Sequence, residues 1–229
     1  MTFIQESLYL GFVFTILAYL FGLWLKQKVG WAVLNPLLVA SGIVIAGLLL
    51  TKTDYETYNQ SAQHISYLLT PATVCLAIPL YKQLHLLKEN FVAVIAAILS
   101  GVAASAVCIF ALCLLFKMDH ISYVSMLPKS ITTAIALGVS EEAGGVVTIT
   151  VVCIMITGIF GNMIGETALR LFGIREPMAK GLALGTSAHA IGTAKALELG
   201  EIEGAMSSLS IAVAGLLTVI AVPLVSGWI

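Results

Sequence analysis

Apolar runs of roughly helix-spanning length follow one another along almost the whole chain, separated by short polar stretches. A helix needs about 20 mostly apolar residues to cross the hydrocarbon core of a bilayer. The runs lie near residues 7–25, 33–50, 64–81, 91–116, 145–168, 179–197 and 204–228. We therefore predict an all-α polytopic membrane protein with about seven spanning helices, in which the whole chain, 1–229, forms one transmembrane domain.

The stretch LPKSITTAIALGVSEEAGG, residues 127–145, differs from the other runs because polar residues interrupt it at both ends. Its apolar part is too short to cross a bilayer as a plain helix. We expect this stretch to enter the membrane only part of the way, as a re-entrant or broken element. A chain with eight full spans is the alternative.

The positions of lysine and arginine in the short loops predict the orientation, because cytoplasmic loops carry an excess of both. The basic loops contain Lys26, Lys28, Lys82, Lys88, Arg170, Arg175 and Lys180. The opposite loops contain Asp54, Glu56, Glu198, Glu201 and Glu203. Basic loops in the cytoplasm place the N-terminus outside. Lys52, Lys117 and Lys129 oppose this arrangement, because it places them outside as well.

Two of the predicted helices are interrupted by helix-breaking or polar residues. They read LLTPATVCLAIPLYK over 68–82 and ALGTSAHAIGTAK over 183–195. In the seven-span arrangement they occupy corresponding places in two halves of opposite orientation, about 30–116 and 122–229. Paired interruptions of this kind point to the substrate site of a transporter with an inverted repeat. Kinks that serve only helix packing are the alternative interpretation.

Composition agrees with a membrane protein and narrows the classes of function. Only 10% of the residues are charged and 59% are hydrophobic, whereas a soluble domain carries about a quarter charged residues. A net charge of −1 gives no basic face for nucleic acid. The four cysteines lie in apolar runs without metal-ligand spacing, and HExxH, GxSxG and phosphate-loop motifs are absent. We therefore expect no metal, no cofactor and no enzymatic activity.

His189 is the most informative single residue, because an ionisable group at membrane depth usually faces the bundle interior or a polar cavity. Thr186, Ser187 and Thr193 lie near it in the same predicted helix and could bind a small anion or a partly dehydrated cation. The alternative is a neutral histidine that donates to one backbone carbonyl. We expect Lys195 to extend to the membrane interface rather than into a cavity.

The element at 127–145 contains the second candidate cluster. Ser130, Thr132 and Thr133 follow Pro128 at a predicted helix start, where free N–H groups favour anions. Lys129 lies in the same cluster.

Carboxylates and single polar residues elsewhere offer weaker candidates. Glu141 and Glu142 close the 127–145 element and suggest a proton or cation site, with a solvated turn as the alternative. Asn35 precedes Pro36 and suits either a substrate contact or a helix cap.

Five segments together resemble the LrgB/CidB family, in the same order and over nearly the whole chain. They are NPLLVA (35–40), TPATVCLAIPLY (70–81), LPKSITTAIA (127–136), GTSAHAIGTAKA (185–196) and EGAMSSL (203–209). Two positions depart from the family pattern. Ala134 stands where the family usually has proline, and Ser187–Ala188 reverses the usual Ala–Ser order.

The resemblance implies a multi-pass protein of the bacterial inner membrane and two alternative functions. One is secondary transport of a small monocarboxylate such as pyruvate or glycolate, with possible H⁺ or Na⁺ coupling. The other is antiholin-like regulation of murein hydrolases and lysis, together with a small LrgA-type membrane partner. A homo-oligomer or a hetero-complex is expected in either case.

We favour the carrier, because two interrupted polar helices are of use to a transport site. The expected substrate-binding residues are Asn35, Thr70, Thr73, Ser130, Thr132, Thr133, Ser187, His189 and Thr193. His189 and Glu141 are the candidates for proton or cation coupling.

Overall fold

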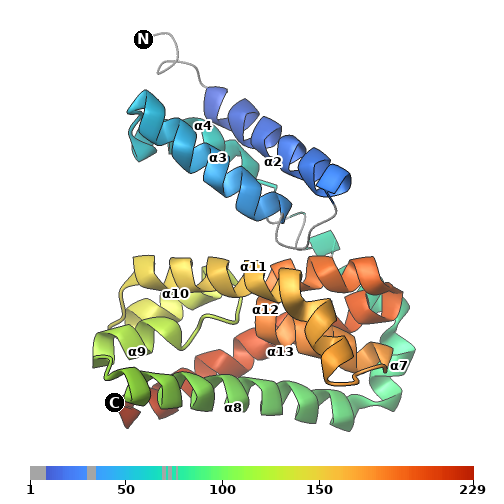
Figure 1. Ribbon diagram of the computed structural model, residues 1–229. Helices are drawn as coiled ribbons and strands as arrows, with labels where there is room; N and C mark the ends of the chain where they lie inside the picture. The colour runs from blue at the N-terminus through green and yellow to red at the C-terminus, as the bar shows by residue number, and fades with distance from the viewer. Residues whose placement is uncertain (1–8, 30–34, 69–70, 72–73, 76) are drawn as a thin grey trace. The chain divides into compact units, whose positions relative to one another are not determined.

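The computed structural model describes residues 9–29, 35–68, 71, 74–75 and 77–229. Every regular element in these residues is helical, which confirms the predicted all-α class (Figure 1). The chain divides into two compact units, residues 1–75 and 76–229. This division does not test the predicted single domain or the predicted inverted halves. Both stay predictions.

In the described residues of the first unit, three helices pack through small residues. They are α2 (Leu10–Val29), α3 (Pro36–Thr51) and α4 (Tyr55–Ser66). Ala18 of α2 is buried against Ala40 and Val44 of α3. The backbone N–H of Gly11 donates to Ser61 Oγ at 2.9 Å, which ties α2 to α4.

Four helices in the described residues are long and apolar enough to cross a membrane. They are α2 and, in the second unit, α8 (Phe91–Phe116), α11 (Val147–Leu171) and α13 (Glu201–Val225). These four correspond to predicted runs. The run at 33–50 forms the shorter α3, and the run at 64–81 is described only in part, with α6 (Ala77–Lys82) at its end and α7 (Leu84–Glu89) after it.

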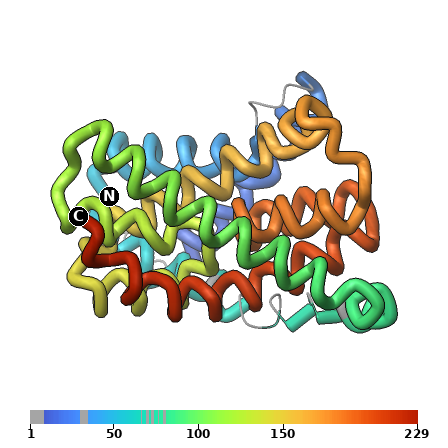
Figure 2. Tube along the Cα trace, turned by 90° about the horizontal axis from the view of Figure 1, so that it is seen from below, coloured from blue at the N-terminus to red at the C-terminus, as the bar shows by residue number. Residues whose placement is uncertain are grey.

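The run at 179–197 forms α12 (Pro177–Leu199), which is interrupted as predicted. Ala188 has φ −131° and ψ 19°, and His189 has φ 43° and ψ −137°, so the helix breaks at this pair. A positive φ is rare for any residue other than glycine and indicates strained backbone. The chain path through α12 can be followed in Figure 2, where it is orange.

Contacts with α11 show that α12 doubles back at the break and forms a helical hairpin. The first arm of the hairpin precedes the break and the second arm follows it. Leu184, in the first arm, packs on Gly165, where an added Cβ would lie 2.6 Å from Leu184 Cδ2. Lys195, in the second arm, pairs with the adjacent Glu166 at 3.1 Å. In a straight helix, residues 184 and 195 would be about 16 Å apart. The 179–197 run is therefore not a straight span.

A second, shorter hairpin consists of α9 (His120–Met126) and α10 (Thr133–Glu142). Tyr123 Oη donates to the carbonyl of Val225 at 2.9 Å, so α9 lies at the C-terminal end of α13. The start of α10 lies farther along α13, because Ile135 is the neighbour of Gly215. With ten residues, α10 is about 15 Å long, which confirms that 127–145 is no full span.

Ion pairs bring the basic and acidic loops of the second unit together at one end. Lys82 pairs with Glu201 at 3.1 Å, and Lys180 Nζ lies 4.0 Å from Glu203. The prediction that placed Glu198, Glu201 and Glu203 opposite the basic loops is therefore wrong. Its cause is the hairpin, because both ends of α12 lie at the same end of α11. The outside position of the N-terminus stays a prediction.

Candidate functional site

The tips of the two hairpins meet beside the middle parts of α8 and α11. His189 at the α12 tip donates from Nε2 to the carbonyl of Ile154 at 3.0 Å. Ile131, in the α9–α10 tip, packs in one buried cluster with the same Ile154. The Ser130 and Ser105 hydroxyl oxygens are 3.5 Å apart, at the outer limit of a hydrogen bond. Two short elements from opposite ends thus converge on one region.

A cavity of about 820 Å³ opens from this meeting point along α8 and the first arm of α12. Asn90 and Glu176 line its outer end, near the starts of these two helices. At its inner end the lining includes polar side chains from three elements. These are Ser105, Lys129, Ser130, Thr186 and Ser187. Alanine and other small or apolar residues form much of the remaining wall, so a small solute has room in it.

Lys129 supplies the positive charge at the inner end of the cavity. Its Nζ donates to Ser130 Oγ at 3.0 Å. It pairs with no carboxylate among the described residues. A cation at membrane depth without a counter-ion is costly, and a small bound anion would supply the missing charge. The expected substrate-binding set did not include Lys129, although its place beside Ser130 after Pro128 was the available signal.

Thr186 is the second residue missing from the expected set. Its Oγ1 is buried and has no hydrogen-bond partner among the described residues, although its side chain lines the cavity. The residue is 8% exposed, and it packs on Gly101 of α8. Buried hydroxyl groups nearly always have a partner. This hydroxyl therefore has unused hydrogen-bonding capacity at the wall of the cavity.

The surroundings of His189 fit the alternative interpretation, in which a neutral histidine donates to one backbone carbonyl. It is 4% exposed, and its donation to Ile154 requires a proton on Nε2. The ring fits against Gly158, where an added Cβ would lie 2.7 Å from Cε1. It is not among the residues that line the large cavity. This geometry fixes the α12 tip on α11.

Thr193 and Ser187 lie on different sides of α12. The Thr193 hydroxyl donates to the carbonyl of His189 at 3.1 Å and lies 2.7 Å from Ser207 Oγ, whose hydroxyl then donates to it. Thr193 is fully buried between α12 and α13. Ser187 lines the cavity and donates to the carbonyl of Ala183 at 2.7 Å. Of the expected substrate-binding residues, the cavity brings together Ser130 and Ser187.

The other expected residues lie away from this cavity or outside the described residues. Thr132 and Thr133 begin α10 but do not line the cavity. Glu141 is exposed near the end of α10. Asn35, in the first unit, caps α3 by accepting from the N–H of Leu37 at 2.9 Å. Thr70 and Thr73 lie outside the described residues.

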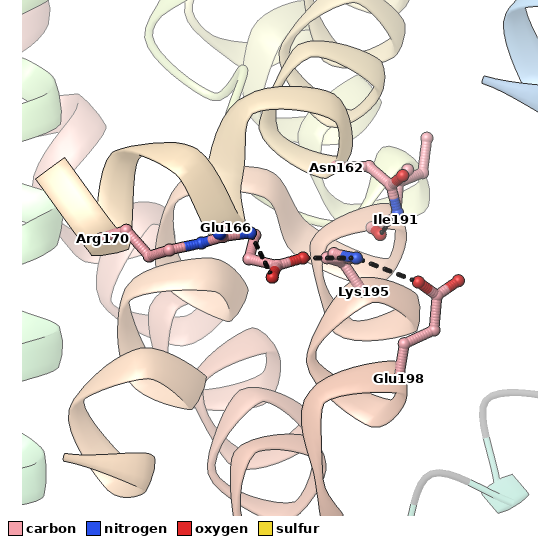
Figure 3. Close-up of polar contacts among 6 residues, drawn as sticks. All are labelled: Asn162, Glu166, Arg170, Ile191, Lys195 and Glu198. Carbon is pink, nitrogen blue, oxygen red and sulfur yellow. Dashed lines mark hydrogen bonds and ion pairs between the residues drawn. The ribbon is translucent and has the colours of Figure 1, made fainter. Parts of the chain in front are cut away.

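Lys195 belongs to a charged network on the second arm of α12, at a distance from the cavity lining. Figure 3 shows its ammonium group between Glu166 and Glu198, at 3.1 Å and 3.2 Å. Asn162 Nδ2 donates to the carbonyl of Ile191 in the same arm at 3.0 Å. These contacts hold the second arm on α11. Among the described residues, no three His, Cys, Asp or Glu side chains gather as a metal site requires.

Comparisons with known proteins cover nearly the whole chain. The model described as the LrgB-like family matches residues 15–228. "Antiholin-like protein LrgB" of Bacillus cereus (strain B4264) and that of Bacillus anthracis (strain CDC 684 / NRRL 3495) are each 38% identical over 217 residues, 94% of this chain and 94% of the relative. No solved structure matches. The expected resemblance is confirmed: this multi-pass membrane protein belongs to the LrgB-like family.

Proposed function

We propose that the chain carries a small monocarboxylate such as pyruvate or glycolate across the bacterial inner membrane. The observation that supports this proposal most strongly is Lys129, an unpaired cation at the inner end of a large cavity. A monocarboxylate provides the single negative charge that this cation lacks. Metal and cofactor are not required, because the cargo leaves chemically unchanged.

The inner end of the cavity offers a complete set of contacts for such an anion. The carboxylate of the substrate accepts a hydrogen bond from Lys129 Nζ. Because both groups are charged, this hydrogen bond is stronger than one between neutral groups. Ser130, which accepts from Lys129, and Thr186, which lines the same cavity, can donate to the remaining oxygens. The Thr186 hydroxyl, which has no partner among the described residues, then gains one.

The two hairpins suit alternating access around this site. Their tips lie on either side of the cavity's inner end, and neither hairpin spans the bilayer on its own. A movement of one tip relative to α8 and α11 would therefore open or close the site from one side. In this proposal His189 holds the α12 tip in place. H⁺ or Na⁺ coupling, with His189 and Glu141 as candidate groups, stays part of the proposal.

Antiholin-like regulation of murein hydrolases and lysis is the second candidate, supported by the names of the relatives. In this alternative the chain acts through assembly with a small LrgA-type partner, not through flux. It predicts a partner-dependent lysis phenotype without movement of a carboxylate. The two candidates also differ in their need for the cavity, which only the carrier uses.

Uptake of labelled pyruvate and glycolate into proteoliposomes tests the proposal. The assay is run with and without an LrgA-type partner, and with an imposed H⁺ or Na⁺ gradient. We expect saturable uptake of at least one acid, and a rate that responds to the coupling gradient. Folded protein that moves neither acid in any arm, with its partner present, would overturn the carrier and favour the regulator.

A further inference from the structure

A second cavity, of about 500 Å³, lies at the end of α11, where the loop to α12 begins. Three cations and one carboxylate line it, from α11, the following loop and the start of α12. They are Arg170, Arg175, Lys180 and Glu166. Leu199, at the other end of α12, also lines this cavity. The cavity therefore touches both ends of the α12 hairpin.

Positive charge is in excess here because the carboxylate is already paired. Glu166 accepts from Arg170 at 2.7 Å and from Lys195 at 3.1 Å (Figure 3). Lys180 is only loosely paired, at 4.0 Å from Glu203. Arg175 is exposed and forms no ion pair among the described residues. Arg175 and Lys180 are thus the groups with charge to offer.

The surface beside this cavity is strongly apolar. Leu171, the last residue of α11, and Phe172, which follows it, are 80% and 77% exposed, and Gly173 lines the cavity. Exposed apolar side chains at the end of a spanning helix contact the membrane interface. A cationic cavity next to such residues suits a ligand with a phosphate group and acyl chains together. A free phosphate ion would make no use of Leu171 and Phe172.

We propose that this cavity binds the phosphate of an anionic phospholipid headgroup. Arginine is suited to this contact, because its guanidinium group meets a phosphate with two parallel hydrogen bonds. Arg175 and Lys180 hold the phosphate, while Leu171 and Phe172 contact the acyl region. Because the cavity touches both ends of α12, the bound lipid braces the hairpin against α11. The site is separate from the carboxylate cavity and independent of its cargo.

The test is lipid retention by the full-length protein, measured by native mass spectrometry after mixing with phosphatidylglycerol or phosphatidylcholine. We compare the wild type with the double variant Arg175→Gln/Lys180→Gln. Lys88→Gln is the matched control, since Lys88 is exposed, basic and outside the cavity lining. We expect the double variant to bind phosphatidylglycerol about 25-fold more weakly, about fivefold for each cation removed.

The control variant should retain phosphatidylglycerol as the wild type does, and phosphatidylcholine should bind weakly to all three proteins. Size-exclusion chromatography shows whether each variant is folded. We expect all variants to fold, because the changed side chains lie at the surface end of the unit. Equal phosphatidylglycerol binding by the double variant and the wild type would overturn the site. Displacement of the lipid by inorganic phosphate at an equal concentration would overturn the assignment to a lipid headgroup.

Discussion

Thr186 and Thr193 lie two helical turns apart in sequence, yet their hydroxyl groups are in opposite situations. The Thr186 hydroxyl is buried at a cavity wall without a partner in the described residues, whereas that of Thr193 has two partners between α12 and α13. A buried polar group without a partner destabilises a fold, while one with good partners contributes modestly to it. In the proposed function, Thr186 therefore contacts the ligand, whereas Thr193 holds α12 on α13.

Thr186→Val and Thr193→Val, which keep the shape of the side chain, should have different effects. We expect Thr186→Val to leave the free energy of unfolding unchanged or slightly raised, and to raise the KM for uptake about three- to tenfold. Thr193→Val should lower the free energy of unfolding by about 1–3 kcal/mol, because it leaves Ser207 and the His189 carbonyl unsatisfied. Denaturation in detergent and uptake kinetics measure the two effects. Equal destabilisation by both variants would contradict this assignment.

His189 combines a strained backbone with a hydrogen bond, so two substitutions separate these contributions. His189→Ala loses the bond to Ile154 and keeps the unfavourable φ of 43°. His189→Gly also loses the bond, but glycine adopts positive φ without steric cost. We expect both variants to melt below the wild type, with the glycine variant about 1 kcal/mol more stable than the alanine variant. An alanine variant as stable as the glycine variant would show that the backbone strain is absent.

At the scale of elements, the α12 hairpin rests on a row of glycines in α11. Gly158, Gly161 and Gly165 face the tip and the first arm so closely that a Cβ would clash with each neighbour. The break itself could be predicted, because GTSAHAIG is rich in glycine and polar residues. The doubling back could not, because it depends on the surface of α11, more than twenty residues earlier. A local sequence pattern carries no information on that distant surface.

Gly161→Ala tests this packing, with Gly138→Ala in α10 as its control. A methyl group at Gly161 would overlap Ala188 Cβ, whereas the space around Gly138 is empty within 4 Å. We expect Gly161→Ala to destabilise the protein by about 1–3 kcal/mol through overpacking. Gly138→Ala should be neutral or stabilising by up to about 1 kcal/mol, since alanine favours a helix. Thermal melting in detergent distinguishes them, and two equally mild effects would contradict a closely seated hairpin.

The depth of Lys129 shows the same limit of prediction from sequence. In the linear chain, a lysine after Pro128 resembles a loop residue, and the charge pattern placed it outside. The short α9–α10 hairpin instead brings it to the inner end of the large cavity. The predicted cluster at this helix start therefore contributes only some of its members to the cavity. Lys129 and Ser130 line it, whereas Thr132 and Thr133 do not.

At the scale of the whole molecule, three long helices and two opposed hairpins make up most of the second unit. Large apolar side chains on the outer faces of the helices stay exposed, as in Leu112 and Leu115 of α8. These faces suit contact with lipid, with a second copy of the chain or with an LrgA-type partner. The hairpins bring the polar side chains at the inner end of the large cavity together at the meeting point of their tips.

In the proposed function, this meeting point holds a carboxylate through Lys129. Equilibrium binding of radiolabelled pyruvate and glycolate to the purified protein tests it most directly, for the wild type, Lys129→Gln and Lys88→Gln. We expect the wild type and Lys88→Gln to bind at least one acid equally, and Lys129→Gln, still folded, to bind it at least about tenfold more weakly. Unchanged binding by Lys129→Gln, or no binding of either acid by the folded wild type, would contradict it.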